Sequence, residues 1–367
     1  MLLFCATDAG GSREVIPIIK EALLRGIPYC VLSSAVTTPI FAGSDIPARE
    51  CVFVSVQEAE HFLRSENISA LILGTTGIIK NERYLNVAAK KLGLLSIAVL
   101  DEWYNYRLRF EDEEGEIGKY LPEVICVQDA LSRELAVKEG LPEKCIRITG
   151  SPALGALSKR AHAFVKHPPN VPQSFQACSD RPVILFLSES LRSAYGAAQG
   201  ECGTHGAFLG YTEESVRQDL ADSLAEIGKE SLVIEKLHPS EHTKEAPRVA
   251  KTIEWRTCVP SEALLPLLWY ADIIVGMHTK ALLEAALLGR KPISYQPQAR
   301  HPESCTAVRL GVAELCSSKD ALLQCLKERI KGGKEKRGPI SHFPFANHDA
   351  AERVLVCVEK LMRDQQV

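Results

Sequence analysis

Short, mostly apolar runs of residues alternate along this chain with longer segments of helical periodicity. A continuous apolar run bounded by turn residues is typical of a parallel strand that helices cover on both faces. Such runs predict strands at residues 2–6, 29–33, 52–54, 70–73, 95–99, 124–127, 146–149, 183–187, 232–237, 273–275 and 292–294. Helices are predicted between them, among others at residues 14–25, 130–139, 213–227 and 261–269. Repeated strand and helix units of this kind form doubly wound parallel sheets, so the predicted fold class is α/β.

The length of the chain and a lapse in this pattern indicate two domains. A chain of 367 residues exceeds what one hydrophobic core usually supports, and 46% hydrophobic residues are enough for two cores. Residues 165–182 contain four prolines and show neither periodicity. We therefore predict two Rossmann-like parallel-sheet domains facing a cleft, at residues 1–165 and 182–345, with a linker at residues 166–181. The last segment, residues 346–367, is predicted to be a helix that crosses back to the first domain.

Charge and composition argue against several classes of protein. The net charge is -3, from 43 basic and 46 acidic residues, which argues against a nucleic-acid partner. No apolar run approaches the roughly 18 residues of a membrane span, and the start of the chain lacks a signal-peptide core. We therefore expect a cytoplasmic protein without a transmembrane segment; peripheral membrane contact and a homodimer stay open. None of the 12 cysteines forms a CxxC pair, so reduced thiols, no metal site and no cofactor are expected.

One stretch has the layout of a phosphate-binding turn. Residues 268–295 contain an apolar strand, a turn at Gly276, a helix and a second apolar strand. The free N–H groups at the start of that helix would face the crevice at the carboxyl end of the sheet. His278 and Thr279 would contact a phosphate held there. A tight connection between strand and helix, without any ligand, is the alternative.

Several segments of the chain resemble those of known carbohydrate enzymes. They are Pro122-Glu-Val-Ile-Cys-Val-Gln-Asp with Gly140-Leu-Pro and Ile146-Arg-Ile-Thr-Gly-Ser-Pro152, then Lys236-Leu-His-Pro-Ser-Glu241, and the stretch 268–297. On these segments the chain resembles GT-B-type glycosyltransferases and the related UDP-N-acetylglucosamine 2-epimerases, which do not hydrolyse their nucleotide sugar. Similar segments occur in capsule and surface-carbohydrate enzymes. The resemblance implies a nucleotide-activated sugar donor, held mainly by the second domain, and a carbohydrate or lipid-linked acceptor.

The second domain supplies the candidates for donor binding. In the family a glutamate near position 284 accepts hydrogen bonds from the nucleotide ribose, so the resemblance makes Glu284 the ribose candidate. Lys236 and His238 follow a strand, where positive charge would neutralise a diphosphate leaving group. A solvated strand end is the alternative. Glu189 and Arg192 follow the first strand of the domain, and Arg192 would clamp phosphate with two hydrogen bonds. Glu189 is placed in the donor site as well, although capping a helix or binding an acceptor hydroxyl would suit it equally.

The first domain supplies the candidates for catalysis. Gly10 and Gly11 follow the first strand in a segment that resembles the glycine loop with which such transferases approach the acceptor or donor phosphate. Asp8, beside them, is a candidate general base for taking the acceptor proton, and a turn-forming aspartate is the alternative. Asp101 and Glu102, after the fifth strand, are further base candidates. All of these residues are expected at the carboxyl edge of the first sheet.

Acceptor binding is predicted for residues that follow the fourth and fifth strands. Besides Gly10 and Gly11, the candidates are Thr75, which lies in a glycine-bounded segment at residues 74–77, and Trp103, Tyr106 and Arg107. Aromatic rings stack on sugar faces, and a guanidinium binds an anionic acceptor. Packing at a domain interface would explain the aromatic residues equally well.

Two departures from the related epimerases decide the order of the functional hypotheses. The chain has Gly276-Met-His-Thr where those enzymes have Gly-Asn-Ser, and it lacks their carboxylate-rich pattern in the first domain. The predicted function is therefore that of a metal-independent GT-B-type glycosyltransferase in surface-polysaccharide or glycoconjugate biosynthesis. A nucleotide-sugar 2-epimerase ranks second, and a noncatalytic relative that binds a nucleotide or carbohydrate is the third hypothesis.

Overall fold

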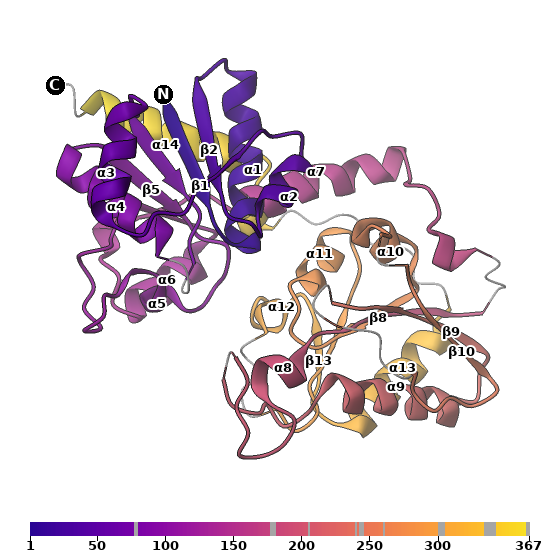
Figure 1. Ribbon diagram of the computed structural model, residues 1–367. Helices are drawn as coiled ribbons and strands as arrows, with labels where there is room; N and C mark the ends of the chain where they lie inside the picture. The colour runs from indigo at the N-terminus through magenta and orange to yellow at the C-terminus, as the bar shows by residue number, and fades with distance from the viewer. Residues whose placement is uncertain are drawn as a thin grey trace. The chain divides into compact units, whose positions relative to one another are not determined.

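The computed structural model describes residues 1–76, 80–176, 181–204, 206–238, 241, 246–259, 261–299, 305–333 and 343–364. The chain divides into two compact units, Met1–Arg160 with His342–Val367 (unit 1) and Ala161–Ser341 (unit 2). Each unit is built on its own sheet, as Figure 1 shows. No helix among these residues has the length and apolar character that a membrane crossing requires.

Unit 1 contains a seven-stranded parallel sheet in the order β3-β2-β1-β4-β5-β6-β7. Its strands are β1 Leu2–Ala6, β2 Tyr29–Ser33, β3 Arg49–Glu50, β4 Ala70–Leu73, β5 Leu95–Val99, β6 Val124–Val127 and β7 Ile146–Ile148. The predicted strand at residues 52–54 is wrong. The Phe53 N–H donates to Asn81 Oδ1 at 2.7 Å, outside the sheet, and the side chains of Val52 and Val54 are exposed. The edge strand that exists instead is short and polar.

Helices cover both faces of this sheet. They are α1 Ala9–Leu24, α2 Thr38–Ala42, α3 Val56–Ser65, α4 Asn81–Leu92, α5 Tyr106–Phe110, α6 Ala130–Lys138 and α14 Ala350–Asp364, while α7 Pro152–Lys166 begins in unit 1 and runs on into unit 2. Alternate residues of β1 point to opposite faces, so Phe4 joins the core under α1 and α14 while Leu3 joins the core under α3 and α4. Helices α1 and α14 lie side by side (Figure 1). The last described residues of the chain therefore complete the core of unit 1.

The start of α1 differs from the predicted glycine loop. The helix begins at Ala9, so Gly10 and Gly11 lie in its first turn, and Asp8 caps it by accepting the Gly11 N–H at 2.6 Å. Glycine is required here by close packing: a Cβ on Gly11 would lie 3.1 Å from the Cα of Gly74. The backbone of α1 thus approaches the end of β4 directly.

Unit 2 contains a six-stranded parallel sheet in the order β10-β9-β8-β11-β12-β13. Its strands are β8 Val183–Leu187, β9 Ser231–Lys236, β10 Ile253–Thr257, β11 Ile273–Gly276, β12 Ile293–Tyr295 and β13 Glu314–Cys316. Its helices are α8 Leu191–Tyr195, α9 Glu213–Ile227, α10 Leu264–Tyr270, α11 Ala281–Leu287, α12 Thr306–Arg309 and α13 Lys319–Lys331. The sequence pattern missed β10 and β13. Both are edge strands with polar, partly exposed residues, so they lack a continuous apolar run.

Candidate functional site

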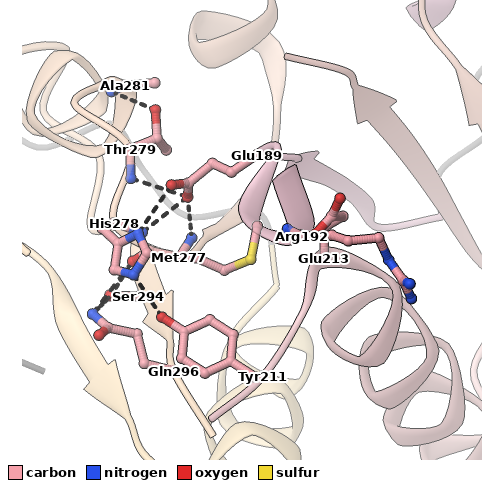
Figure 2. A network of polar contacts seen from close by, with 10 residues as sticks. All are labelled: Glu189, Arg192, Tyr211, Glu213, Met277, His278, Thr279, Ala281, Ser294 and Gln296. Atoms are coloured by element: carbon pink, nitrogen blue, oxygen red, sulfur yellow. Dashed lines mark hydrogen bonds and ion pairs between the residues drawn. The ribbon is translucent and has the colours of Figure 1, made fainter. Parts of the chain in front are cut away.

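A polar network joins the carboxyl ends of β8 and β11, which are neighbours in the sheet of unit 2. Glu189 follows β8, and the turn after β11 contains Met277, His278 and Thr279. One carboxylate oxygen, Glu189 Oε1, accepts the backbone N–H groups of all three, at 3.1, 2.9 and 3.0 Å (Figure 2). The N–H groups that the sequence assigned to a phosphate therefore bind a carboxylate of the protein itself.

The imidazole of His278 is held on both sides. Its Nδ1 lies 3.1 Å from Glu189 Oε2, and its Nε2 lies 2.8 Å from the hydroxyl of the buried Tyr211 (Figure 2). Burial raises the pKa of the Glu189 carboxyl, but His278 and the backbone N–H groups outweigh it, so the pKa lies below its ordinary value. An ionised carboxylate only accepts hydrogen bonds, so Nδ1 of His278 carries a hydrogen. In the neutral ring Nε2 then accepts from Tyr211.

Further hydrogen bonds fix the turn after β11. The Ser294 hydroxyl donates to the carbonyl oxygen of Met277, and Gln296 Nε2 donates to Ser294 Oγ at 2.8 Å (Figure 2). Thr279 Oγ1 accepts the N–H of Ala281 at 3.2 Å, and Glu284 lies partly buried in α11. Gly276 has little room for a side chain, since a Cβ there would lie 3.1 Å from Leu282 Cδ2.

Arg192 is separate from this network. Its side chain points away from Glu189 (Figure 2), lies half exposed and forms an ion pair of 3.4 Å with Glu214. Its backbone N–H donates to Glu213 at 2.9 Å. Arg192 is therefore not part of the network around Glu189. Its role in binding a phosphate stays a prediction.

Lys236 and His238 lie at the end of β9 beside a buried ion network. Lys236 Nζ donates to the carbonyl oxygen of Glu262 at 3.0 Å, and the His238 N–H donates to Glu241 at 2.8 Å. Glu241 also accepts the Ser188 hydroxyl at 2.9 Å and lies 3.6 Å from the guanidinium of the buried Arg217. Sequence reasoning missed Arg217, because a charged residue inside an amphipathic helix resembles a solvated one. These contacts fix the strand end.

A second cluster of charged side chains lies at the carboxyl edge of unit 1. Asp8, Thr75 and Asp101 follow β1, β4 and β5, which are adjacent in the sheet. A Cβ built on Gly10 would lie 1.9 Å from Asp101 Oδ2 and 3.5 Å from Asp8 Oδ1, so the two carboxyl groups flank the same point. Arg109 Nη1 donates to Asp101 Oδ1 at 2.8 Å and to the Thr75 hydroxyl. The structure therefore brings these predicted residues together and adds Arg109.

Two carboxyl groups of this cluster have pKa values raised towards neutral pH. Burial and the charge of Asp101 raise the pKa of Asp8 to about 6. Glu82, in the first turn of α4, is buried and accepts the N–H of Thr7 at 2.8 Å and its hydroxyl at 2.7 Å. Burial raises the pKa of Glu82 to about 7. Sequence reasoning missed Glu82, since a glutamate at a helix start is usually solvated.

The aromatic candidates of unit 1 are core residues. Trp103 and Tyr106 are fully buried; Trp103 Nε1 lies 3.1 Å from both carboxylate oxygens of Asp129, and the Tyr106 hydroxyl lies 2.8 Å from Ser132 Oγ. Neither ring presents a face to a sugar, and the partners of both lie within unit 1 rather than at a domain interface. Arg107 is exposed and pairs with Glu111 at 3.1 Å. Glu102 is partly buried next to Asp101. The predicted segment at residues 74–77 ends in Gly77, which lies outside the described residues. No group of three metal-ligating side chains occurs in the described parts of the chain.

Comparison with known proteins identifies the fold. No protein-family model matches the chain, and no curated protein sequence matches it. Solved structures do match over nearly its whole length. The UDP-GlcNAc 2-epimerase of Methanocaldococcus jannaschii has a TM-score of 0.67 at 15% identity, covering 98% of this chain and 99% of its own. The UDP-GlcNAc 2-epimerase of Neisseria meningitidis, bound to UDP-GlcNAc, has a TM-score of 0.63 at 14% identity with the same coverage.

A transferase with this architecture matches as well. MurG of Acinetobacter baumannii has a TM-score of 0.56 at 13% identity, covering 98% of this chain and 99% of its own. At these identities the likeness concerns the fold, and it confirms the predicted pair of GT-B-like α/β domains. The predicted resemblance to GT-B glycosyltransferases and UDP-GlcNAc 2-epimerases is likewise confirmed at the level of the fold.

Proposed function

We propose that this chain is an enzyme that acts on a nucleotide-activated sugar, and that it epimerises the sugar rather than transferring it. The fold is shared with epimerases, one of which is bound to UDP-GlcNAc, and with MurG. The observation that carries the choice is the carboxyl cluster of unit 1, formed by Asp8, Glu82 and Asp101.

The carboxyl cluster bears on one of the two departures that placed epimerisation second. These were the Gly276-Met-His-Thr turn and the absence of a carboxylate-rich pattern in the first domain, and the cluster concerns the latter. The three acidic residues are far apart in the sequence, so no local pattern reveals them, yet the parallel sheet brings two strand ends and a helix start together. Epimerisation beside the anomeric carbon breaks a C–H bond while its electron pair expels the nucleoside diphosphate, and the reverse addition returns the diphosphate and a proton to the same two carbons, without an acceptor. Carboxyl groups such as Asp8 and Glu82, with a pKa of about 6 and about 7, suit both steps at neutral pH.

The nucleotide is proposed to bind unit 2 at the carboxyl edge of β8 and β11. There His278, Thr279 and Glu284 are the proposed contacts, as the sequence suggested. Glu189 already accepts hydrogen bonds from the N–H groups of the turn. We therefore expect side chains, rather than those N–H groups, to hold the diphosphate. Lys236 and His238, at the end of the adjacent β9, are the proposed source of positive charge.

Incubation with UDP-GlcNAc in D2O, without any acceptor, tests the reaction. We expect the sugar to gain one deuterium at the inverted carbon and a second stereoisomer to appear in the NMR spectrum. The D8N and E82Q variants are expected to lose about 100-fold or more of this exchange, because each lacks a proton-transfer group. The D320N variant changes an exposed aspartate of α13 and serves as the matched control.

Glycosyl transfer is the second candidate, and the turn after β11 favours it. That turn reads Gly276-Met-His-Thr instead of the Gly-Asn-Ser of the related epimerases. Release of UDP that depends on an added acceptor, with no deuterium in the sugar, would establish transfer and exclude epimerisation. Binding of nucleotide sugars without turnover, with or without acceptors, would exclude both enzymes.

A further inference from the structure

We propose that Arg109 determines which of the two carboxyl groups beside Gly10 carries the proton: it keeps Asp101 as a carboxylate and leaves the exchangeable proton to Asp8. Resting on the proposed function, this makes Asp8 a proton donor of the reaction and Asp101 the ionised carboxylate beside it. Arg109 itself is a positioning residue, since it acts through Asp101.

Arg109 forms a buried ion pair with Asp101. Arg109 lies in α5 with only 9% of its side chain exposed. Its Nη1 is the atom that donates to Asp101 Oδ1, to the Thr75 hydroxyl and, at 3.3 Å, to the Thr75 carbonyl oxygen. Its buried Nε has no hydrogen-bond partner among the described residues. A buried guanidinium is stable only beside a carboxylate, so the ion pair requires Asp101 to stay ionised.

The two carboxyl groups beside Gly10 differ in their partners. No ion pair of Asp8 occurs in the described part of the chain; its Oδ1 accepts the N–H of Gly11 as a helix cap. The charged and titratable groups that act on it are Asp101 after β5, Arg109 in α5 and Glu82 in α4. Two adjacent carboxylates cannot both ionise easily, so the one without a cation takes the proton. The pKa of Asp8, raised to about 6, agrees with this order.

The backbone at Gly10 brings the carboxyl groups of Asp8 and Asp101 close together. Asp101 Oδ2 would lie 1.9 Å from a Cβ on Gly10, which means that the carboxylate occupies the space of the missing side chain. The absence of that Cβ lets Asp101 reach the first turn of α1, where Asp8 is the cap. The close approach of the two carboxyl groups is therefore a property of the fold and requires no bound substrate.

Carboxyl titration by NMR tests the assignment on the full chain without substrate. The aspartates are labelled with 13C at the carboxyl carbon, and the D8N and D101N variants assign the two signals. In the unmodified protein we expect Asp8 to titrate near pH 6 and Asp101 to stay ionised well below that. In R109M the midpoint of Asp101 should rise by about one pH unit or more, whereas R109K, which keeps the charge, should stay close to the parent. An unchanged midpoint in R109M would overturn the proposal.

The D101N variant provides a second test that does not depend on the folding of R109M. It removes the neighbouring negative charge and keeps an oxygen that accepts from Arg109. The midpoint of Asp8 should then fall by about one pH unit or more. A midpoint that remains near pH 6 would contradict the assignment, because burial alone would then explain the proton on Asp8.

The two proposals fail separately. Titrations that shift as expected, in a protein that turns over no nucleotide sugar, support the proton assignment and refute the proposed function. Turnover of UDP-GlcNAc with the same pH profile in R109M and the parent supports the function and refutes the role of Arg109. If both hold, R109M should shift the acid or alkaline limb of the pH profile, and R109K should restore it.

Discussion

The requirement for glycine is clearest at Gly10, because the carboxylate of Asp101 occupies the space that a side chain at this position would fill. Replacing a glycine in a helix by alanine usually raises the free energy of unfolding of the protein by about 1 kcal/mol. We expect the opposite for G10A. The new Cβ would force Asp101 away from its pair with Arg109, at a cost of about 1–3 kcal/mol in the free energy of unfolding. Urea denaturation measures this, and G118A is the control, because a Cβ on Gly118 meets no atom within 4 Å.

The raised pKa values of unit 1 predict how stability depends on pH. Asp8 and Glu82 have a pKa of about 6 and about 7 in the folded chain, above the roughly 4 of an unfolded chain. Between pH 4 and 7 the folded state therefore binds more protons, so the free energy of unfolding falls as the pH rises.

The D8N variant isolates the share of Asp8 in this pH dependence. Asparagine caps a helix as well as aspartate does but does not ionise. Urea denaturation at pH 5 and pH 8 should show D8N losing about 1–1.5 kcal/mol less than the parent over this range. Equal losses would contradict a proton on Asp8, and the exposed D320N should behave like the parent.

The tautomer of His278 is a further property of single residues. Glu189 accepts the hydrogen of Nδ1, so an E189Q variant whose Oε1 remains on the three N–H groups presents an amide donor to Nδ1 instead. We expect the hydrogen to move to Nε2, where the Tyr211 hydroxyl then accepts it. Long-range 15N–1H NMR spectra of the imidazole report the change. Y211F should keep the parent tautomer, and the same tautomer in E189Q would argue against the assignment.

Single residues also show why the sequence predicts only part of the site. Asp8, Thr75 and Asp101 follow apolar strands, so their shared edge of the sheet follows from strand periodicity alone. Glu82 and Arg109 lie on helices, where the pattern does not distinguish a buried charge from a solvated one. Glu189 shows a different limit: its contact with the turn after β11 depends on the adjacency of β8 and β11 in the sheet, which the sequence does not give.

At the scale of elements, burial decided which strands the sequence predicts. The central strands are mostly apolar and were predicted within a residue or two, whereas β3, β10 and β13 are edge strands with polar, exposed side chains. They therefore lack a continuous apolar run, while the edge strand β7, which contains two isoleucines, was predicted.

Capping residues at helix ends also stabilise single elements, and the N-terminal cap of α9 can be tested. Thr212 and Ser215 form a reciprocal capping box, in which the Thr212 hydroxyl accepts the Ser215 N–H at 3.3 Å. We expect T212A to lower the free energy of unfolding of unit 2 by about 1 kcal/mol. T212S retains the oxygen and should lie close to the parent. An equal loss in T212S would assign the effect to the methyl group rather than to the cap.

The hydrophobic cores of unit 1 share no described residue with the core of unit 2. Substitution in one core should therefore lower the thermal transition of that unit alone. Leu355 of α14 is fully buried in the core of unit 1, and L355A is expected to cost about 2–5 kcal/mol there. The neighbouring Val356 is exposed, so V356A serves as the control. Calorimetry of both variants beside L220A, in the core of unit 2, measures the two transitions; a joint shift of both by L355A would refute independent cores.

The position of α14 has a consequence for the order of events on the ribosome. Unit 1 begins the chain, but Val354, Leu355 and Val358 of its core belong to α14 and are made after the whole of unit 2. The usual order of synthesis, in which the first domain folds first, is thus reversed. Until α14 is made, the apolar sheet surface that this helix covers stays exposed in nascent unit 1, so we expect unit 1 to be the part of the protein most prone to aggregate during that interval.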